Sequence, residues 1–197
     1  MKSVSDEDVM LQVRNGEVEM LGVLFDRYQA PLHSFYSRMT QDRTVSEDLV
    51  QEVFLRILRY RQTYRPGTTF RTWMYQIARN TRLDQVRKTR PETPFASEPV
   101  APTLSDSAQQ QQQAAMLQNA LMQLPEDKRE ILILSRFQEL KYDEIARLLG
   151  CEVGSVKVRV HRALQQLREI FLLLDSTPAS TDLRAPRHST SPTRGVQ

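Results

Sequence analysis

A group of hydroxyl-bearing and cationic side chains recurs at helical spacing late in the chain. It comprises Ser155, Lys157, Arg159 and Arg162. Arginine can form paired hydrogen bonds with the edge of guanine, and lysine and serine can contact phosphates, so these residue types suit the major groove of DNA. Residues 153–168 include four Lys or Arg and no carboxylate that would repel DNA. The pattern predicts recognition of nucleic acid, which requires no covalent chemistry by this chain.

Two short helices around a tight turn are expected to position this group. Residues 142–149 carry an apolar stripe, and Gly150 has the backbone freedom that ends a helix. A second helix is predicted after the turn 150–152, because apolar residues recur every three or four positions. These residues are Val153, Val156, Val160, Ala163, Leu164 and Leu167. The basic side chains fall on the opposite face, as in a helix-turn-helix whose second helix enters the major groove.

A simpler interpretation of the same segment stays open. A helix with one apolar and one charged face is commonly a solvated surface helix without any partner. The small residue Ala146, the glycine turn and the acid-free second helix together favour DNA binding over that interpretation.

Positive charge is concentrated in a second segment as well. The net charge of the whole chain is only +3, but residues 55–90 hold ten Lys or Arg against one Asp. Residues 1–54 hold five basic residues against ten acidic ones. Phe70 and Trp73 are expected in the core beside the cations. A basic surface bordered by aromatic residues suits the phosphates and exposed bases of a single strand, although arginines that only solubilise the helix are the alternative.

Helical periodicity covers most of residues 1–90 and predicts one small domain there. Ser5 and Ser46 are expected to cap helices, Gly16 is expected to stop one, and the segment 61–69 is expected to be a loop. The expected helices are 5–15, 17–39, 46–60 and 70–90.

The composition changes abruptly at residue 91. Residues 91–113 contain four prolines, small polar residues and five consecutive glutamines, and such a segment buries too little apolar surface to fold. It is predicted to be a flexible linker. A second helical domain is predicted over 114–175, with a first helix beginning there or within the glutamine run, and residues 176–197 are predicted to be a disordered tail. The expected fold is all-α, with two small helical domains.

Several kinds of site are not expected. Cys151 is the only cysteine, which excludes an internal disulfide, and the three histidines are scattered, so no metal cluster is predicted. The absence of a phosphate-binding glycine loop and of a nucleophile motif predicts no cofactor, no small-molecule substrate and no enzymatic activity. The start of the chain lacks a signal-peptide core, and no apolar run approaches the roughly 20 residues that span a bilayer. A reducing, cytoplasmic location is therefore expected.

Four sequence motifs occur in a fixed order along the chain. They are SEDLVQEVFLRI at 46–57, FRTWMYQIARNTRLDQVRK at 70–88, LPEDKREILIL at 124–134 and YDEIARLLGCEVGSVKVRVHRALQQLR at 142–168. In this order they resemble the extracytoplasmic-function sigma factors of the bacterial sigma-70 family, and the resemblance covers about residues 5–174. A helix-turn-helix alone occurs in many regulators, whereas the first two motifs do not accompany it elsewhere.

The resemblance implies that the chain binds core RNA polymerase and directs it to promoter DNA. Docking on polymerase would fall to Asp48, Gln51, Glu52 and Leu55. The downstream, minus-10 element would be opened and held by Tyr64, Arg65, Arg79, Asn80, Asp84, Arg87 and Lys88. The upstream, minus-35 element would be read by Ser155, Lys157, Arg159 and Arg162. An anti-sigma factor, which can hold such a protein at the membrane, is a further implied partner.

The sequence alone leaves two other functions open. A stand-alone helix-turn-helix regulator would bind duplex DNA without polymerase, and an all-helical adaptor would have no affinity for DNA.

The chain departs from the family pattern at Lys141, where the family often has a capping Ser or Thr. Loss of such a cap costs about 1 kcal/mol and is expected to loosen the following helix.

Overall fold

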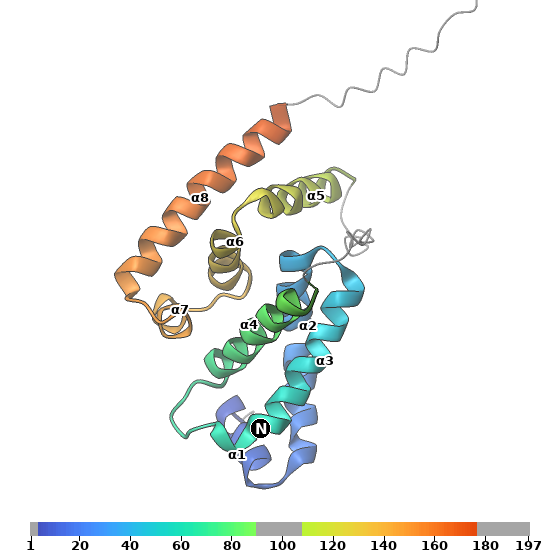
Figure 1. The fold of residues 1–197 in the computed structure, drawn as a ribbon, viewed down its shortest axis with the longest axis vertical. Coiled ribbons are helices and arrows are strands. Elements are labelled where there is room, and N and C mark those ends of the chain that lie inside the picture. Colours follow the sequence, from blue (N-terminus) through green and yellow to red (C-terminus); the bar gives the residue numbers. More distant parts are fainter. Residues whose placement is uncertain (1–3, 90–107, 177–197) are drawn as a thin grey trace, which may run out of the picture.

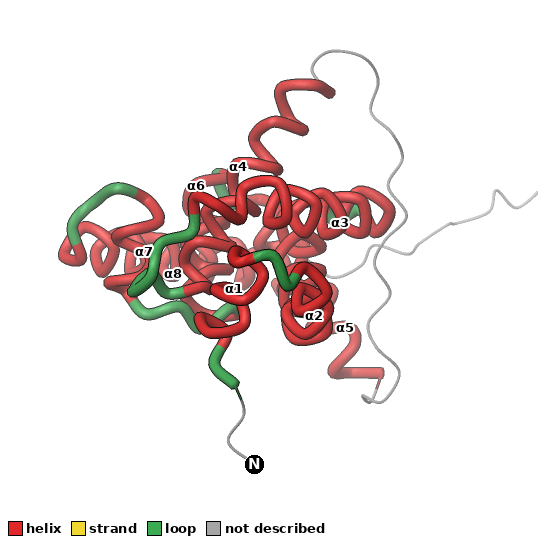
Figure 2. The backbone as a smooth tube through the Cα atoms, turned by 90° about the horizontal axis from the view of Figure 1, so that it is seen from below, coloured by secondary structure: helices red, strands yellow, loops and turns green. Residues whose placement is uncertain are grey.

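Every regular element of the described residues is helical (Figures 1 and 2), which confirms the all-α fold. The structure is a computed structural model that describes residues 4–89 and 108–176. The helices are α1 (Asp6–Asn15), α2 (Leu21–Thr40), α3 (Arg43–Tyr60), α4 (Phe70–Thr89), α5 (Ala108–Gln123), α6 (Glu126–Leu132), α7 (Tyr142–Leu149) and α8 (Val153–Ser176). Short 3-10 turns occupy Val18–Met20 and Arg61–Thr63, and a π-helical turn, Ile133–Phe137, continues α6.

The first region consists of α1 to α4, in which α3 packs between α2 and α4. The ends of α1 are as predicted. The hydroxyl of Ser5 accepts a hydrogen bond from the backbone N–H of Asp8 at 3.1 Å, and Gly16 ends the helix with a φ of 115°. A residue with a Cβ adopts that left-handed conformation only at a cost, so glycine is the suitable stop.

The start of α3 differs from the prediction. Asp42, and not Ser46, is the N-cap, since its side chain accepts a hydrogen bond from the backbone N–H of Val45 at 2.9 Å. Ser46 lies within the first turn, is fully buried and donates to the backbone oxygen of Asp42. Tyr60 continues the helical row of the buried residues Leu49, Val53 and Ile57, but at the end of α3 it is 44% exposed.

The start of α4 depends on a residue far away in the sequence. The carboxylate of Glu7, from α1, accepts a hydrogen bond from the backbone N–H of Phe70 at 3.0 Å. Beside it the ring of Tyr64 makes edge-on contacts with Phe70 and Trp73, and the rings of Phe70 and Trp73 are tilted at 45° to one another. These contacts fix the loop 61–69 against the amino end of α4.

The second region consists of α5 to α8 and contains the predicted helix-turn-helix. Gly150 ends α7 with a φ of 63°, and the backbone N–H of Cys151 returns to the oxygen of Ala146. Lys141 supplies no side-chain cap, but Glu144 accepts a hydrogen bond from the backbone N–H of Lys141 at 2.8 Å. The start of α7 therefore keeps one half of a capping box.

The two regions pack directly against one another. The buried apolar residues of both form one continuous cluster, in which α4 lies against α7 and α2 against α5 (Figure 1). Helix α5 begins at Ala108, within the segment that was expected to be linker, and so includes the glutamine run. The rest of that linker and the tail beyond Ser176 lie outside the described residues.

Candidate nucleic-acid and polymerase interfaces

The amino-terminal half of α8 presents the residues predicted to read the upstream DNA element. Val156, Val160 and Ala163 are fully buried, and this fixes the rotation of the helix on its domain. Ser155, Lys157 and Arg162 are exposed on the other side. We call this exposed side the reading face.

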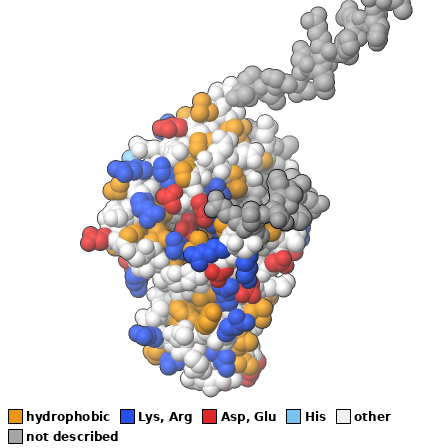
Figure 3. All heavy atoms as spheres, in the orientation of Figure 1, with side chains coloured by type: hydrophobic (Ala, Val, Ile, Leu, Met, Phe, Trp, Pro, Cys, Tyr) orange, Lys and Arg blue, Asp and Glu red, His pale blue; other side chains and the backbone are white. Residues whose placement is uncertain are grey.

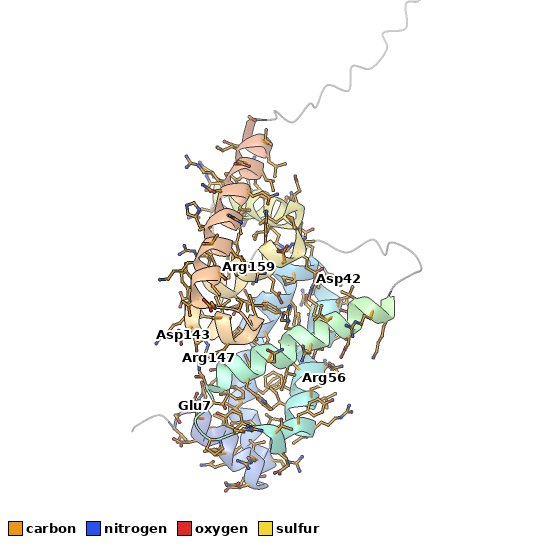
Figure 4. All side chains as sticks on the ribbon, turned by 60° about the vertical axis from the view of Figure 1, so that its left-hand side comes forward. Glu7, Asp42, Arg56, Asp143, Arg147 and Arg159 are labelled. Carbon is orange, nitrogen blue, oxygen red and sulfur yellow. The ribbon has the colours of Figure 1, made fainter. Side chains whose placement is uncertain are left out.

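Arg159 lies at the border of the reading face, with 39% of its side chain exposed (Figure 4). Its guanidinium lies 3.9 Å from the carboxylate of Asp127, which is 64% exposed. An ion pair at this distance and exposure contributes little to stability, so the arginine can exchange this partner for DNA.

Val158 also belongs to the reading face and was not identified from the sequence. It is 49% exposed and lies among Ser155, Lys157 and Arg162. Helical spacing contained the signal, since Val158 follows Val156 by two positions and is therefore rotated about 200° away from the buried row. An apolar residue at the centre of a polar surface can contact the methyl group of thymine.

The second predicted DNA-binding group lies on α4 and the loop before it. Arg65, Asn80, Arg87 and Lys88 are exposed. Arg79 is 32% exposed and pairs with Glu130 of α6, with its Nε 3.1 Å from Oε1. The structure thus presents four of the predicted residues to solvent and engages Arg79 with the second region.

Tyr64 occupies a different environment from the one expected. Its ring is 1% exposed and packs edge-on against Trp73 with 5.3 Å between ring centroids, while its hydroxyl donates to the backbone oxygen of Thr68. Burial raises the pKa of Tyr64 to about 12. In this structure the residue supports the loop and offers no ring face to a base.

Asp84 and Glu52 share one arginine. Arg56 of α3 donates to Glu52 on its own helix and to Asp84 on α4, each at 2.7 Å, and it lies beside α4 (Figure 4). The hydrogen bond from Arg56 holds the pKa of Asp84 below its usual range. Asp84 is therefore a negative group inside the basic helix, engaged in fixing α4 to α3.

The four residues predicted to dock on polymerase lie on one exposed side of α3. Asp48 and Gln51 are exposed, Glu52 is partly exposed, and Leu55 is 60% exposed. Leu49, Val53 and Ile57 point the other way and are buried. A single exposed leucine is common on a solvated surface, and one flanked by acidic and amide groups can also belong to a protein-docking surface.

The surface charge is mixed where the two regions meet. Figure 3 shows Lys and Arg side chains adjoining Asp and Glu side chains across the middle of the molecule.

Within residues 4–89 and 108–176, no group of three or more His, Cys, Asp or Glu is arranged to hold a metal ion. In the same ranges no helix is long and apolar enough to cross a membrane.

The described residues are all helical, with a helix-turn-helix in one region and a basic helix in the other, and this combination is typical of DNA-binding transcription proteins. Comparison with known families agrees with this class. Residues 24–92 match the model of sigma-70 region 2, and residues 114–167 match that of sigma-70 region 4.

Individual relatives support the same conclusion. The RNA polymerase sigma factor CarQ of Myxococcus xanthus is 33% identical over 165 residues, which cover 82% of this chain and 95% of CarQ. The ECF RNA polymerase sigma factor SigW of Bacillus subtilis is 26% identical over 174 residues, covering 80% and 92%. The sigma factor RpoE of Bartonella quintana, solved with the anti-sigma factor NepR, has a TM-score of 0.66 at 25% identity, with 77% of this chain and 96% of that chain covered.

The chain belongs to the sigma-70 family of RNA polymerase sigma factors, and within it to the extracytoplasmic-function group. Its activity is therefore to direct core RNA polymerase to promoters, which excludes a regulator that acts without polymerase. Members of this family are initiation factors, and polymerase supplies the catalysis.

Proposed function

We propose that the reading face of α8 recognises the upstream promoter element in the major groove. The observation that supports this most directly is that Ser155, Lys157 and Arg162 are exposed together on the second helix of a helix-turn-helix. Arg162 can reach a base edge or a phosphate, and Lys157 and Ser155 can contact phosphates. Arg159 can also contact DNA once its guanidinium no longer pairs with the carboxylate of Asp127.

Val158 adds apolar readout to this face. A β-branched residue at an exposed helical site costs about 0.5 kcal/mol relative to alanine and leaves apolar surface in water. Both costs are offset if Val158 packs against a thymine methyl when the helix enters the groove. The upstream element should therefore contain a thymine opposite the centre of the reading face.

The exposed residues of α4 and its loop contact the downstream element. Arg65, Arg87 and Lys88 supply cations for phosphates, and Asn80 supplies an amide that can bond to a base edge. Tyr64 acts indirectly in this proposal, because it holds the loop that carries Arg65. Asp84 orients α4 through Arg56.

The exposed side of α3 is the surface for core polymerase. Leu55 would enter an apolar site on the enzyme, with Asp48, Gln51 and Glu52 as a polar rim.

The chain would act in the bacterial cytoplasm, where polymerase and promoters are found, and without an enzymatic activity of its own. An anti-sigma factor is its proposed regulator, since the similar RpoE structure contains one.

The assignment of the reading face can be tested with two arginines of one helix. Arg162→Ala removes a cation from the face, and Arg168→Ala removes an equal charge further along α8, where the side chain is also exposed. Binding should be measured on an upstream element taken from a promoter that the chain transcribes, and on a scrambled version. We expect Arg162→Ala to lose about 1–3 kcal/mol on the true element and less on the scrambled one. Equal losses for both variants would contradict the assignment.

A further inference from the structure

Helix α1 carries none of the residues proposed above to contact DNA or polymerase, yet it holds both ends of the loop that carries Arg65. We propose that Glu7 of α1 is a positioning residue for the downstream promoter strand, because it fixes the loop 61–69 and the first turn of α4 in the conformation that presents Arg65. This inference rests on the proposed role of that loop. Glu7 acts through the loop and does not itself touch DNA.

The first tether joins α1 to the amino end of α4. The carboxylate of Glu7 accepts a hydrogen bond from the backbone N–H of Phe70 at 3.0 Å (Figure 4). Phe70 is the first residue of α4 and is fully buried, so water does not reach this N–H in the folded chain. A negative group at this position also interacts favourably with the helix dipole. Loss of the Glu7 carboxylate would therefore leave the first turn of α4 without this cap.

The second tether joins α1 to the other end of the loop. Nε2 of Gln62 donates to the backbone oxygen of Arg14, in the last turn of α1, at 2.8 Å. Between the tethers the backbone N–H of Thr68 donates to the backbone oxygen of Arg65 at 3.1 Å and closes a tight turn. Gly67 permits this turn with a φ of 81°. Arg65 is thus the first residue of a closed turn that α1 holds on both sides.

Helix α1 is itself fixed to the rest of the first region. Its inner side consists of fully buried apolar residues, Val9, Met10 and Val13. At its amino end the carboxylate of Asp6 accepts hydrogen bonds from Arg27 and from the hydroxyl of Tyr28, both on α2. The core of the first region therefore sets the position of the loop through α1.

Charge alone would give Glu7 the opposite effect on DNA binding. A carboxylate beside a loop that binds DNA repels phosphates, so its removal would tighten strand binding if electrostatics were its only role. Removal of the cap would weaken strand binding, because the conformation that presents Arg65 would be less populated. The sign of the change in affinity therefore separates a positioning role from a charge effect.

Three variants of the full chain in complex with core polymerase test this role. Glu7→Ala removes the cap, whereas Glu7→Gln removes the charge and keeps an oxygen that can accept from the N–H of Phe70. Asp8→Ala is the matched control, since it removes an equal charge from an exposed position in the same turn of α1. The measured quantity is the dissociation constant of a labelled single-stranded oligonucleotide that carries the downstream element of a promoter transcribed by the chain.

We expect Glu7→Ala to bind the strand about fivefold more weakly than the wild-type chain, which is the effect that loss of one helix cap has on the populated conformation. Glu7→Gln and Asp8→Ala should match the wild-type chain. Gln62→Ala, which removes the second tether and changes no charge, should also weaken strand binding.

Trp73 supplies a second readout, because it is the only tryptophan of the chain and lies against the loop. Its ring packs edge-on against that of Tyr64, with 5.3 Å between the ring centroids. In the free chain, Glu7→Ala and Gln62→Ala should each increase the quenching of its fluorescence by acrylamide, whereas Glu7→Gln should not. A role in global stability alone would lower the unfolding midpoint of Glu7→Ala and leave the quenching and the strand affinity of the folded chain unchanged.

The proposal is overturned if folded Glu7→Ala binds the strand as tightly as the wild-type chain or more tightly. An equal loss of affinity in Asp8→Ala or in Glu7→Gln would also overturn it. Should Glu7→Ala fail to fold, Gln62→Ala decides, since its side chain is exposed, and unchanged affinity and quenching in this variant would contradict the proposal.

Arg65→Ala tests the underlying assignment of the loop separately. If strand binding survives this change, the proposed role of the loop in DNA binding fails, and the positioning role of Glu7 fails with it. The quenching of Trp73 then still reports whether Glu7 holds the loop, so the two failures can be distinguished.

Discussion

Replacing Val158 with alanine tests whether the reading face uses apolar contact to recognise DNA. The substitution removes two methyl groups from a side chain that is 49% exposed. Burial of a methylene-sized group contributes about 0.8 kcal/mol, and about half of the removed surface is available to DNA. The expected loss is therefore about 0.8 kcal/mol, or about fourfold in the dissociation constant.

The assay is a double-mutant cycle between the protein and the DNA. Wild-type chain and Val158→Ala are each titrated against an upstream element with thymine and against the same element with uracil, which lacks only the methyl group. The cycle cancels the gain in helix propensity that alanine brings, because this gain is the same on both DNAs. At one thymine of the element, the coupling free energy should be about 0.5–0.8 kcal/mol.

A coupling near zero at every thymine of the element would refute the contact, even if Val158→Ala weakened binding overall. A uniform loss on both DNAs would mean that Val158 only shapes the helix. Arg162→Ala serves as the control in the same assay, because an arginine contact to guanine or phosphate does not sense the thymine methyl.

The other predictions concern docking and pH. Changing Asp48 and Leu55 together to alanine should abolish co-purification with core polymerase while leaving the unfolding midpoint nearly unchanged, because both side chains are exposed; retained co-purification would remove the docking surface. The hydrogen bond from Arg82 holds the pKa of Glu126 below its usual range in the folded chain. The ionised Glu126 carboxylate therefore stabilises the folded chain at pH values above the pKa that Glu126 has in the unfolded chain. This contribution is lost as the pH falls through the lower pKa of the folded chain. The difference in unfolding free energy between the wild-type chain and Glu126→Gln, measured by urea titration, should therefore shrink from pH 6 to acidic pH; a difference independent of pH would contradict this role.

Local sequence signals predicted the parts of the fold that depend on near neighbours. The stop at Gly16, the Ser5 cap and the helix-turn-helix around Gly150 each follow from residues within a few positions.

Features that depend on distant residues could not be obtained from local patterns. Glu7 caps α4 from another helix, and Tyr64 is buried in a cluster with the rings of Phe70 and Trp73 on α4. The cap of α3 is Asp42, four residues before the expected Ser46, and the side chain of Ser46 is buried in the core instead.

The packing of the two regions was also beyond local reasoning. The sequence indicated two bodies joined by a linker, and it offered no signal that Glu126 and Glu130 face Arg82 and Arg79. At Glu139 the chain turns with a φ of 51°, a conformation that a non-glycine residue rarely adopts. This turn follows Gln138, which contacts α4.

Transcription by core polymerase tests the central claim most directly. The purified chain is mixed with core enzyme and a library of promoter fragments, and the starts of the transcripts are mapped. We expect defined starts that are absent with core enzyme alone and that share an upstream and a downstream element. Transcripts that start at the same places with and without the chain would contradict it.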